Sequence, residues 1–170
     1  ISTADVAAMS RLTESYREQG VIGCPPGPPQ DVRGELRSIL HYKIGCEYNR
    51  TEPHVSVSSV AASDYIYEMA KIMGYATPQS YHCGVHPISP LKLEGEEFDV
   101  ALHFWKRLGS KLKVDVGPMP IMGVTSPVFF PSSLAQSIAE GLGGFVFFNL
   151  LTGGDDVGFW FKKTKPPRPS

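Results

Sequence analysis

Residues 112–127, LKVDVGPMPIMGVTSP, decide how this sequence is interpreted. The first five, 112–116, are predicted to form a short apolar strand. The next eleven, 117–127, contain three prolines and two glycines, which predict a long loop of fixed shape. An apolar helix then begins near Ser132 and runs to about Leu150. A strand, a stiff loop and a helix therefore follow one another here.

The same alternation of strand and helix extends along the chain in both directions. Five strands are predicted, at residues 21–24, 54–57, 81–87, 112–116 and 157–161. Five helices are predicted, at residues 2–20, 31–45, 61–73, 95–108 and 132–150. No hairpin signal separates the strands, so we expect an α/β fold of sequential parallel βαβ units.

Two architectures fit this alternation, an open doubly wound sheet and a TIM (β/α)8 barrel. No dinucleotide-binding fingerprint follows the first predicted strand, which argues against the open nucleotide-binding form. A complete barrel typically takes about 250 residues, more than the 170 present. We therefore expect a partial or shortened TIM barrel, with residues 1–161 as a single domain and residues 162–170 as a tail.

The composition is that of an ordinary globular protein, with 42% hydrophobic and 19% charged residues. A formal net charge of -1 argues against a nucleic-acid-binding protein and against a polybasic membrane patch. No apolar run reaches the roughly 18 residues needed to cross a membrane, and residues 1–20 lack the pattern of a signal peptide. The 3 cysteines are too scattered for a disulfide framework, so we expect a cytoplasmic protein without membrane or nucleic-acid partners.

Four motifs occur in order in the second half of the chain. They are SPLKL at 89–93, PMPIMGVTSP at 118–127, LAQ at 134–136 and AEGLGG at 139–144. Their order and spacing over about sixty residues resemble the trimethylamine methyltransferase family. In that family an SPL element follows a barrel strand, a G-x-T-x-P turn comes next, and a helix with the pattern AQ…AE-x-L-x-G follows.

The resemblance implies a (β/α)8 barrel that takes a methyl group from a methylated amine, tertiary or quaternary, such as trimethylamine or glycine betaine. The methyl acceptor would be the Co(I) corrinoid (cobalamin) of a partner corrinoid protein, and no cofactor is expected to bind tightly to this chain. Two alternatives remain open. One is a non-catalytic partial-barrel module that binds a corrinoid protein or a small cationic ligand, and the other is an unrelated open-sheet α/β enzyme.

The candidate site follows from where barrel enzymes place their chemistry, at the carboxyl ends of the strands. Here these are the loops after Val57, Val85 and Val116. A quaternary substrate leaves as a neutral amine and needs no general acid, so orienting the substrate is the main task. No catalytic residue is assigned. The residues expected to bind substrate, on these grounds and by the resemblance, are His86, Ser89, Met119, Met122, Thr125, Gln136 and Glu140.

Each part of this site has a plainer alternative. His86 either lines the site or is a hydrogen-bonded structural histidine. The prolines of the loop 117–127 either shape an apolar pocket or only route the chain into the next helix. His82 and His86 would share one face of a strand about 13 Å apart, at about 3.3 Å per residue. That distance is too long for one zinc ion, so no metal site is expected.

Gln136 and Glu140 are i,i+4 neighbours on an otherwise apolar helix, so they either face water or pair inside the protein. We favour an exposed polar stripe, because glutamate is rarely buried alone. The run 141–144, Gly-Leu-Gly-Gly, costs about 1 kcal/mol of helix stability per glycine. Close packing of a neighbouring backbone would explain that cost.

Aromatic residues are dense at 145–148 and 159–161, and we expect them in a core or an interface rather than in a cation-binding box. A partial barrel would have two open edges and uncovered apolar surface. We therefore expect self-association, or further chain that completes the fold.

Overall fold

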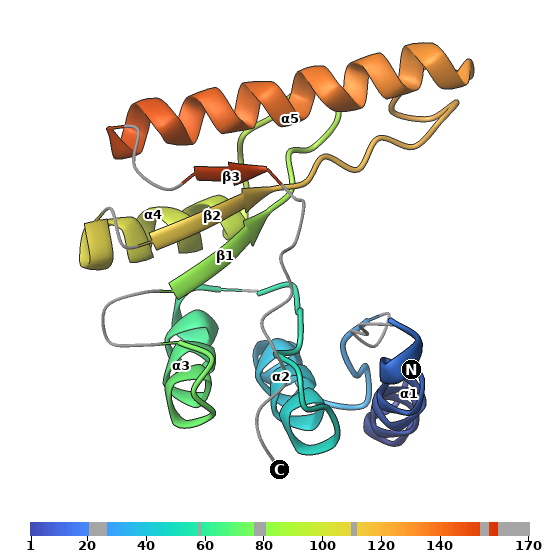
Figure 1. Ribbon diagram of the computed structural model, residues 1–170, viewed down its shortest axis with the longest axis vertical. Coiled ribbons are helices and arrows are strands. Elements are labelled where there is room, and N and C mark those ends of the chain that lie inside the picture. The colour runs from blue at the N-terminus through green and yellow to red at the C-terminus, as the bar shows by residue number, and fades with distance from the viewer. Residues whose placement is uncertain (21–26, 58, 77–80, 110–111, 154–156, 160–170) are drawn as a thin grey trace. The chain divides into compact units, whose positions relative to one another are not determined.

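The structure, a computed structural model, describes residues 1–20, 27–57, 59–76, 81–109, 112–153 and 157–159. The chain divides into two compact units, one containing Ile1–Thr77 and the other Pro78–Lys162. The described part of the first unit contains helices, whereas the second unit alternates strands and helices (Figure 1). The prediction of a single domain over residues 1–161 stays a prediction.

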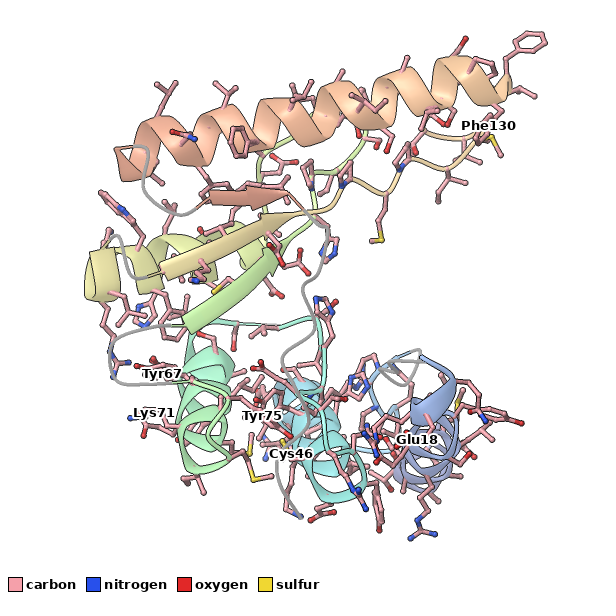
Figure 2. The ribbon with its side chains drawn as sticks, in the orientation of Figure 1. Glu18, Cys46, Tyr67, Lys71, Tyr75 and Phe130 are labelled. Carbon is pink, nitrogen blue, oxygen red and sulfur yellow. The ribbon has the colours of Figure 1, made fainter. Side chains whose placement is uncertain are left out.

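The first unit contains three α-helices, α1 (Thr3–Ser15), α2 (Arg37–Tyr48) and α3 (Val60–Ile72), and two 3-10 turns, η1 (Arg17–Gln19) and η2 (Gly34–Leu36). Ser2 caps α1 in a capping box with Asp5, and Ser59 caps α3. Lys71 lies over the ring of Tyr67 on α3, 5.0 Å from its centroid (Figure 2). The three predicted helices are thus present in this unit, and side chains cap the starts of α1 and α3.

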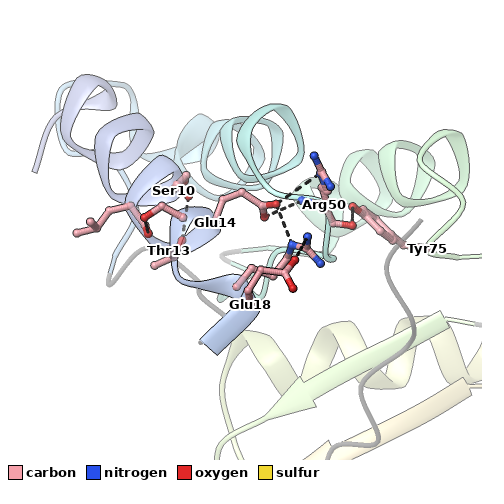
Figure 3. A network of polar contacts seen from close by, with 9 residues as sticks. Ser10, Thr13, Glu14, Glu18, Arg50 and Tyr75 are labelled. Atoms are coloured by element: carbon pink, nitrogen blue, oxygen red, sulfur yellow. Dashed lines mark hydrogen bonds and ion pairs between the residues drawn. The ribbon is translucent and has the colours of Figure 1, made fainter. Parts of the chain in front are cut away.

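A polar network around Glu14 ties the ends of these helices together (Figure 3). The Glu14 carboxylate accepts hydrogen bonds from Nε of Arg17 at 3.1 Å and from the backbone N–H of Arg50 at 3.1 Å. The Tyr75 hydroxyl donates to the carbonyl of Arg50 at 3.3 Å. Residues that follow α1, α2 and α3 are therefore joined at one end of the unit.

Two predictions for this unit are wrong. Residues 54–57 were expected to form a strand, but they pair with no strand among the described residues, and a strand exists only as part of a ladder. Gly45 was expected to stop a helix, but α2 continues to Tyr48. A Cβ on Gly45 would lie 2.6 Å from the ring of Pro53, so this glycine allows close packing instead. The strand predicted at 21–24 lies outside the described residues.

The second unit has the order β1 (Tyr81–Val85), α4 (Glu96–Leu108), β2 (Leu112–Val116), α5 (Phe130–Thr152) and β3 (Val157–Phe159). Its sheet is parallel with the strands in chain order. The strands predicted at 81–87 and 112–116 are confirmed, and β3 lies within the predicted 157–161. The expectation of sequential parallel βαβ units is confirmed for these three strands, not for five.

One face of this sheet is buried by both connecting helices. Leu112, Val114 and Val116 of β2 are buried, whereas the alternate residue Lys113 is exposed and Asp115 is half-buried. A Cβ on Gly144 of α5 would lie 2.6 Å from Cγ1 of Val116, so α5 packs on the buried face. Helix α4 also contacts β1 and β2, and its Phe98 meets α5.

The contact between the two helices is aromatic. Phe98 of α4 stacks on Phe148 of α5, with ring centroids 5.6 Å apart, and Phe147 meets Phe98 edge to face at 6.5 Å. Phe148 is fully buried. The prediction that the aromatics at 145–148 belong to a core is therefore confirmed for Phe148, while the side chains of 159–161 lie outside the described part of the chain.

Helix α5 is longer than the helix predicted at 132–150, and it is strongly apolar. Its segment Phe130–Leu151 has 22 residues and a mean hydropathy of 1.3, enough by length and composition to cross a membrane. Polar residues such as Gln136 and Glu140 interrupt this segment and lower its mean hydropathy, but the mean stays high enough. The expectation that no apolar stretch reaches this length is therefore wrong by length and composition. Phe130 lies at the end of α5 that projects furthest from the sheet (Figure 2). Length and composition alone do not separate a membrane span from a helix that packs on protein.

Candidate functional site

The loops that follow β1 and β2 begin side by side. Val85 pairs with Val116, and the N–H of Gly117 donates to the carbonyl of Val85 at 3.0 Å. A Cβ on Gly117 would lie 3.4 Å from Cδ2 of His86, an ordinary contact distance, so the start of the loop lies directly against the imidazole. The prediction that His86 and the proline-rich loop meet at the carboxyl edge of the sheet is confirmed at Gly117.

His86 forms a pair with Glu97 from the first turn of α4. Its Nδ1 lies 2.8 Å from Oε2 of Glu97, and its backbone N–H donates to the same oxygen at 2.9 Å. This hydrogen bond raises the pKa of His86 above its usual value, although partial burial of the ring opposes the shift. His86 is thus a hydrogen-bonded histidine at a strand end. This position fits a residue that lines the site and also fits a structural histidine.

A second polar group centres on Glu140, whose residue is only 2% exposed. Its Oε2 accepts from the Ser89 hydroxyl at 2.6 Å, and its Oε1 accepts from the N–H of Leu91 at 3.3 Å. Nε2 of Gln136 donates to Oε1 of Glu140 at 2.8 Å and to the carbonyl of Thr125 at 2.9 Å. The favoured reading of an exposed stripe is therefore wrong. Glu140 is buried because it is not alone: three donors compensate the loss of water.

The loop from Gly117 to Pro127 is held by its own hydrogen bonds. The Thr125 hydroxyl accepts from the N–H of Ile121 at 2.9 Å, and Gly123 adopts a φ of +78° that favours glycine. The Ser126 and Ser133 hydroxyls lie 2.7 Å apart and join the loop to α5. The expectation of a loop with a defined shape is confirmed for these residues.

The glycines of α5 permit close packing, as expected, but against side chains rather than backbone. A Cβ on Gly143 would lie 3.0 Å from Cδ1 of Leu91, and a Cβ on Gly144 would lie 2.6 Å from Cγ1 of Val116. Leu91 belongs to the loop after β1 and Val116 ends β2. The glycines therefore let α5 approach the carboxyl ends of both strands.

The structure brings together four of the seven residues predicted to bind substrate. Ser89, Thr125, Gln136 and Glu140 share one hydrogen-bonded group, described above. Met119 and Met122 are 67% and 53% exposed, and whether they line a substrate pocket stays a prediction. No set of three or more metal-ligating side chains lies together among the described residues. The side chain of His82 is not among them, so the expectation about metal also stays a prediction.

Two contributors to this edge were not found from the sequence. Glu97 is one of three acidic residues in the first turn of α4, with Glu96 and Asp99, and only the fold selects it. The N–H of Leu91 is a backbone donor with no sequence signal. Leu91 does lie within the SPLKL motif, which was the available signal that this segment is special.

Residues 2–160 match the family model described as Trimethylamine methyltransferase (MTTB). The chain belongs to the trimethylamine methyltransferase family. The match spans nearly the whole chain, including both compact units, and it confirms the resemblance drawn from the motifs at 89–144. Membership implies a methyltransferase. No curated protein matches the chain.

Proposed function

We propose that this member of the trimethylamine methyltransferase family transfers a methyl group from a methylated amine to the Co(I) corrinoid of a partner protein. The observation that carries the proposal is the family match over residues 2–160. The meeting of the loops after β1 and β2 at one edge of the sheet supports it, because barrel enzymes hold their substrates at that edge.

The sheet is proposed to be an arc of a (β/α)8 barrel. A barrel keeps its strands parallel and in chain order and its helices on the outer face. The order β1-β2-β3 and the packing of α4 and α5 on one face agree with this arrangement. In such a barrel the opposite face of β2, with Lys113 and Asp115, would point to the interior.

The reaction breaks the bond between the methyl carbon and nitrogen, and the electron pair of that bond leaves with the amine. Co(I) supplies the electron pair of the new bond to carbon. Since a quaternary substrate releases a neutral amine, no residue has to protonate it. The described residues would contribute position and charge, which can lower a barrier substantially when the reacting groups are aligned.

The His86–Glu97 pair gives the edge a charge suited to a cation. With a neutral imidazole the pair carries one negative charge from Glu97, and with a protonated imidazole its net charge is zero. Neutral His86 would therefore attract a methylated ammonium more strongly. The binding of a cationic amine is accordingly expected to strengthen as the pH rises through the pKa of His86.

The direct test is methyl transfer by the native protein from trimethylamine or glycine betaine to free Co(I) cobalamin. Loss of the Co(I) absorption band and formation of methylcobalamin are expected with at least one amine. An unmethylated amine serves as the control substrate. The absence of turnover with every methylated amine and with an added corrinoid protein would overturn the assignment. Amine or corrinoid-protein binding without turnover would favour the non-catalytic module instead.

A further inference from the structure

We propose that Glu140 is a positioning residue that clamps the loop after β1 to the loop after β2. The hydrogen bonds around it define the clamp, which consists of Glu140, Gln136, Ser89 and the N–H of Leu91. The consequence for catalysis rests on the proposed function, whereas the mechanical claim about the loops does not.

Glu140 is placed to hold the loops and not to contact substrate. Its carboxylate has almost no exposure, and both of its oxygens accept hydrogen bonds from within the protein. A buried carboxylate is costly unless such bonds compensate it. The presence of a carboxylate on this largely apolar helix is explained if its role is to form these hydrogen bonds.

The two loops are linked through the two members of the i,i+4 pair. Glu140 binds the loop after β1 by accepting hydrogen bonds from the Ser89 hydroxyl and the Leu91 N–H. Gln136 binds the loop after β2 by donating a hydrogen bond to the carbonyl of Thr125. The amide of Gln136 has two hydrogens, and both are used, one on Thr125 and one on Glu140. A continuous chain of hydrogen bonds therefore runs from one loop to the other.

Helix α5 serves as the rigid support for this chain. Each loop has another contact on the same helix, Leu91 against Gly143 and Ser126 with Ser133. These contacts flank the Gln136–Glu140 pair along α5. The helix thus fixes the separation between two loops that both begin at the proposed substrate edge.

Three substitutions separate the parts of the clamp. Glu140→Leu removes the acceptor of Ser89, Leu91 and Gln136 while keeping a side chain of similar size. The chain of hydrogen bonds between the two loops is then cut at its centre, and Gln136 loses the partner that orients its amide. Gln136→Leu removes the bonds to Thr125 and to Glu140 but leaves Ser89 and Leu91 bonded to Glu140, and Ser89→Ala removes one link to the loop after β1. Glu140→Gln is the rescue variant: its oxygen accepts from Leu91 and Gln136, and its amide donates to the Ser89 hydroxyl.

Hydrogen exchange of the full chain, read by mass spectrometry, tests the mechanical claim. Glu140→Leu is expected to speed exchange in both segments 88–92 and 121–126, while Gln136→Leu speeds it in 121–126 alone. Glu140→Gln and the control Ser132→Ala, at an exposed position on the same helix, are expected to leave both segments protected. Protection of β1, β2 and α4 should be unchanged throughout. Equal exchange in wild type and Glu140→Leu, or uniform loss across the unit, would overturn the clamp.

Methyl transfer then tests the consequence. Glu140→Leu is expected to lower kcat by roughly 100-fold, the loss that a misplacement of about 1 Å can cause. Glu140→Gln should retain most of the wild-type kcat. A kcat that falls equally in both variants would mean that the charge of Glu140 matters chemically, which contradicts a positioning role. If the wild type has no activity but the exchange pattern holds, the clamp stands and the proposed function fails.

Discussion

Helices α4 and α5 follow consecutive strands and pack on the same face of one sheet, yet they distribute their side chains in opposite ways. Helix α4 buries Phe98 and Phe104 and exposes its charged residues except Glu97, which is half-buried against His86. Helix α5 buries its single acidic residue, Glu140. Its outward residues are apolar and exposed: Phe130, Leu134, Ile138, Leu142, Val146 and Leu150. The first helix has the pattern of a helix that faces water, and the second does not.

The two helices therefore have different roles. An apolar face toward the sheet and a polar face toward solvent stabilise a helix wherever it lies, as in α4. Helix α5 uses its inner face partly to hold two loops, and its outer face is expected to be covered by another surface, because contiguous exposed apolar residues usually mark a contact site. The outer face of α5 is where the expected self-association, or further chain, would be placed.

The largest expected effect concerns the inner face of α4. Phe104 has no exposed surface, so Phe104→Ala should lower the free energy of unfolding by about 3–5 kcal/mol. Leu142→Ala on the outer face of α5 should change it by less than about 0.5 kcal/mol in the monomer. Urea denaturation measures both. Similar losses at the two positions would show that Leu142 is already covered, and the contrast between the helices would be wrong.

The next effect concerns the close approach of α5 to β2. Alanine is usually better than glycine in a helix by about 1 kcal/mol. Gly144→Ala should nevertheless destabilise the protein by about 1–3 kcal/mol, because its Cβ would lie 2.6 Å from the stiff, β-branched Val116. Gly143→Ala is the matched comparison, since it meets only the flexible end of Leu91 at 3.0 Å.

Thermal unfolding of these variants, together with the double variant Gly144→Ala/Val116→Ala, checks the explanation. Removing the Val116 methyl groups should make room for the new Cβ, so the two substitutions should cost less together than the sum of their separate costs. Strict additivity would mean that the contact between Gly144 and Val116 does not limit the packing.

A smaller effect is expected from the outer face of α5. Replacing Ile138 with lysine places a charge in the middle of the exposed apolar residues, where an interface would have to desolvate it. If copies of the chain associate through this face, Ile138→Lys should weaken association at least about tenfold, or about 1.4 kcal/mol. Light scattering across a concentration series measures it, with Lys43→Glu in the first unit as a charge-changing control. A wild-type monomer that binds no dye for exposed apolar surface would contradict the expected self-association.

Local sequence patterns predicted the second unit well where structure depends on near neighbours. The strand Leu112–Val116 and the helix Glu96–Leu108 occur almost where they were expected, since an apolar run and a glycine at each helix end are local signals. The strand predicted at 54–57 is absent because its formation depends on a distant partner and not on near neighbours. A strand needs a partner, and its presence is not encoded in the four residues themselves.

In the candidate site too, some features could be predicted from the sequence and others depend on residues far apart in the chain. His86 and the loop 117–127 could be placed at one edge because parallel strands bring their carboxyl ends together. The burial of Glu140 could not be predicted, because its partners Ser89 and Leu91 lie 51 and 49 residues upstream. The general rule that glutamate avoids the interior applies to an unpaired carboxylate, and only the fold supplies the pairs.

The pH dependence of the His86–Glu97 pair should be smaller still. Glu97 bonds α4 to the residue that follows β1, much as Glu140 bonds α5 to the loop after that strand. The folded-state pKa of His86 is raised above the ordinary 6.5, so the pair stabilises the fold fully below pH 6.5. That stability is lost as the pH rises through the folded pKa. Glu97→Gln should therefore remove about 1 kcal/mol at pH 5.5 and progressively less at higher pH, when His86 is neutral in both proteins. Urea denaturation at several pH values measures the difference, and NMR titration of the imidazole should show a lower pKa in the variant. A difference that grows toward pH 9 would mean that Glu97 supports the neutral form of His86, and the charged contact inferred for α4 would be wrong.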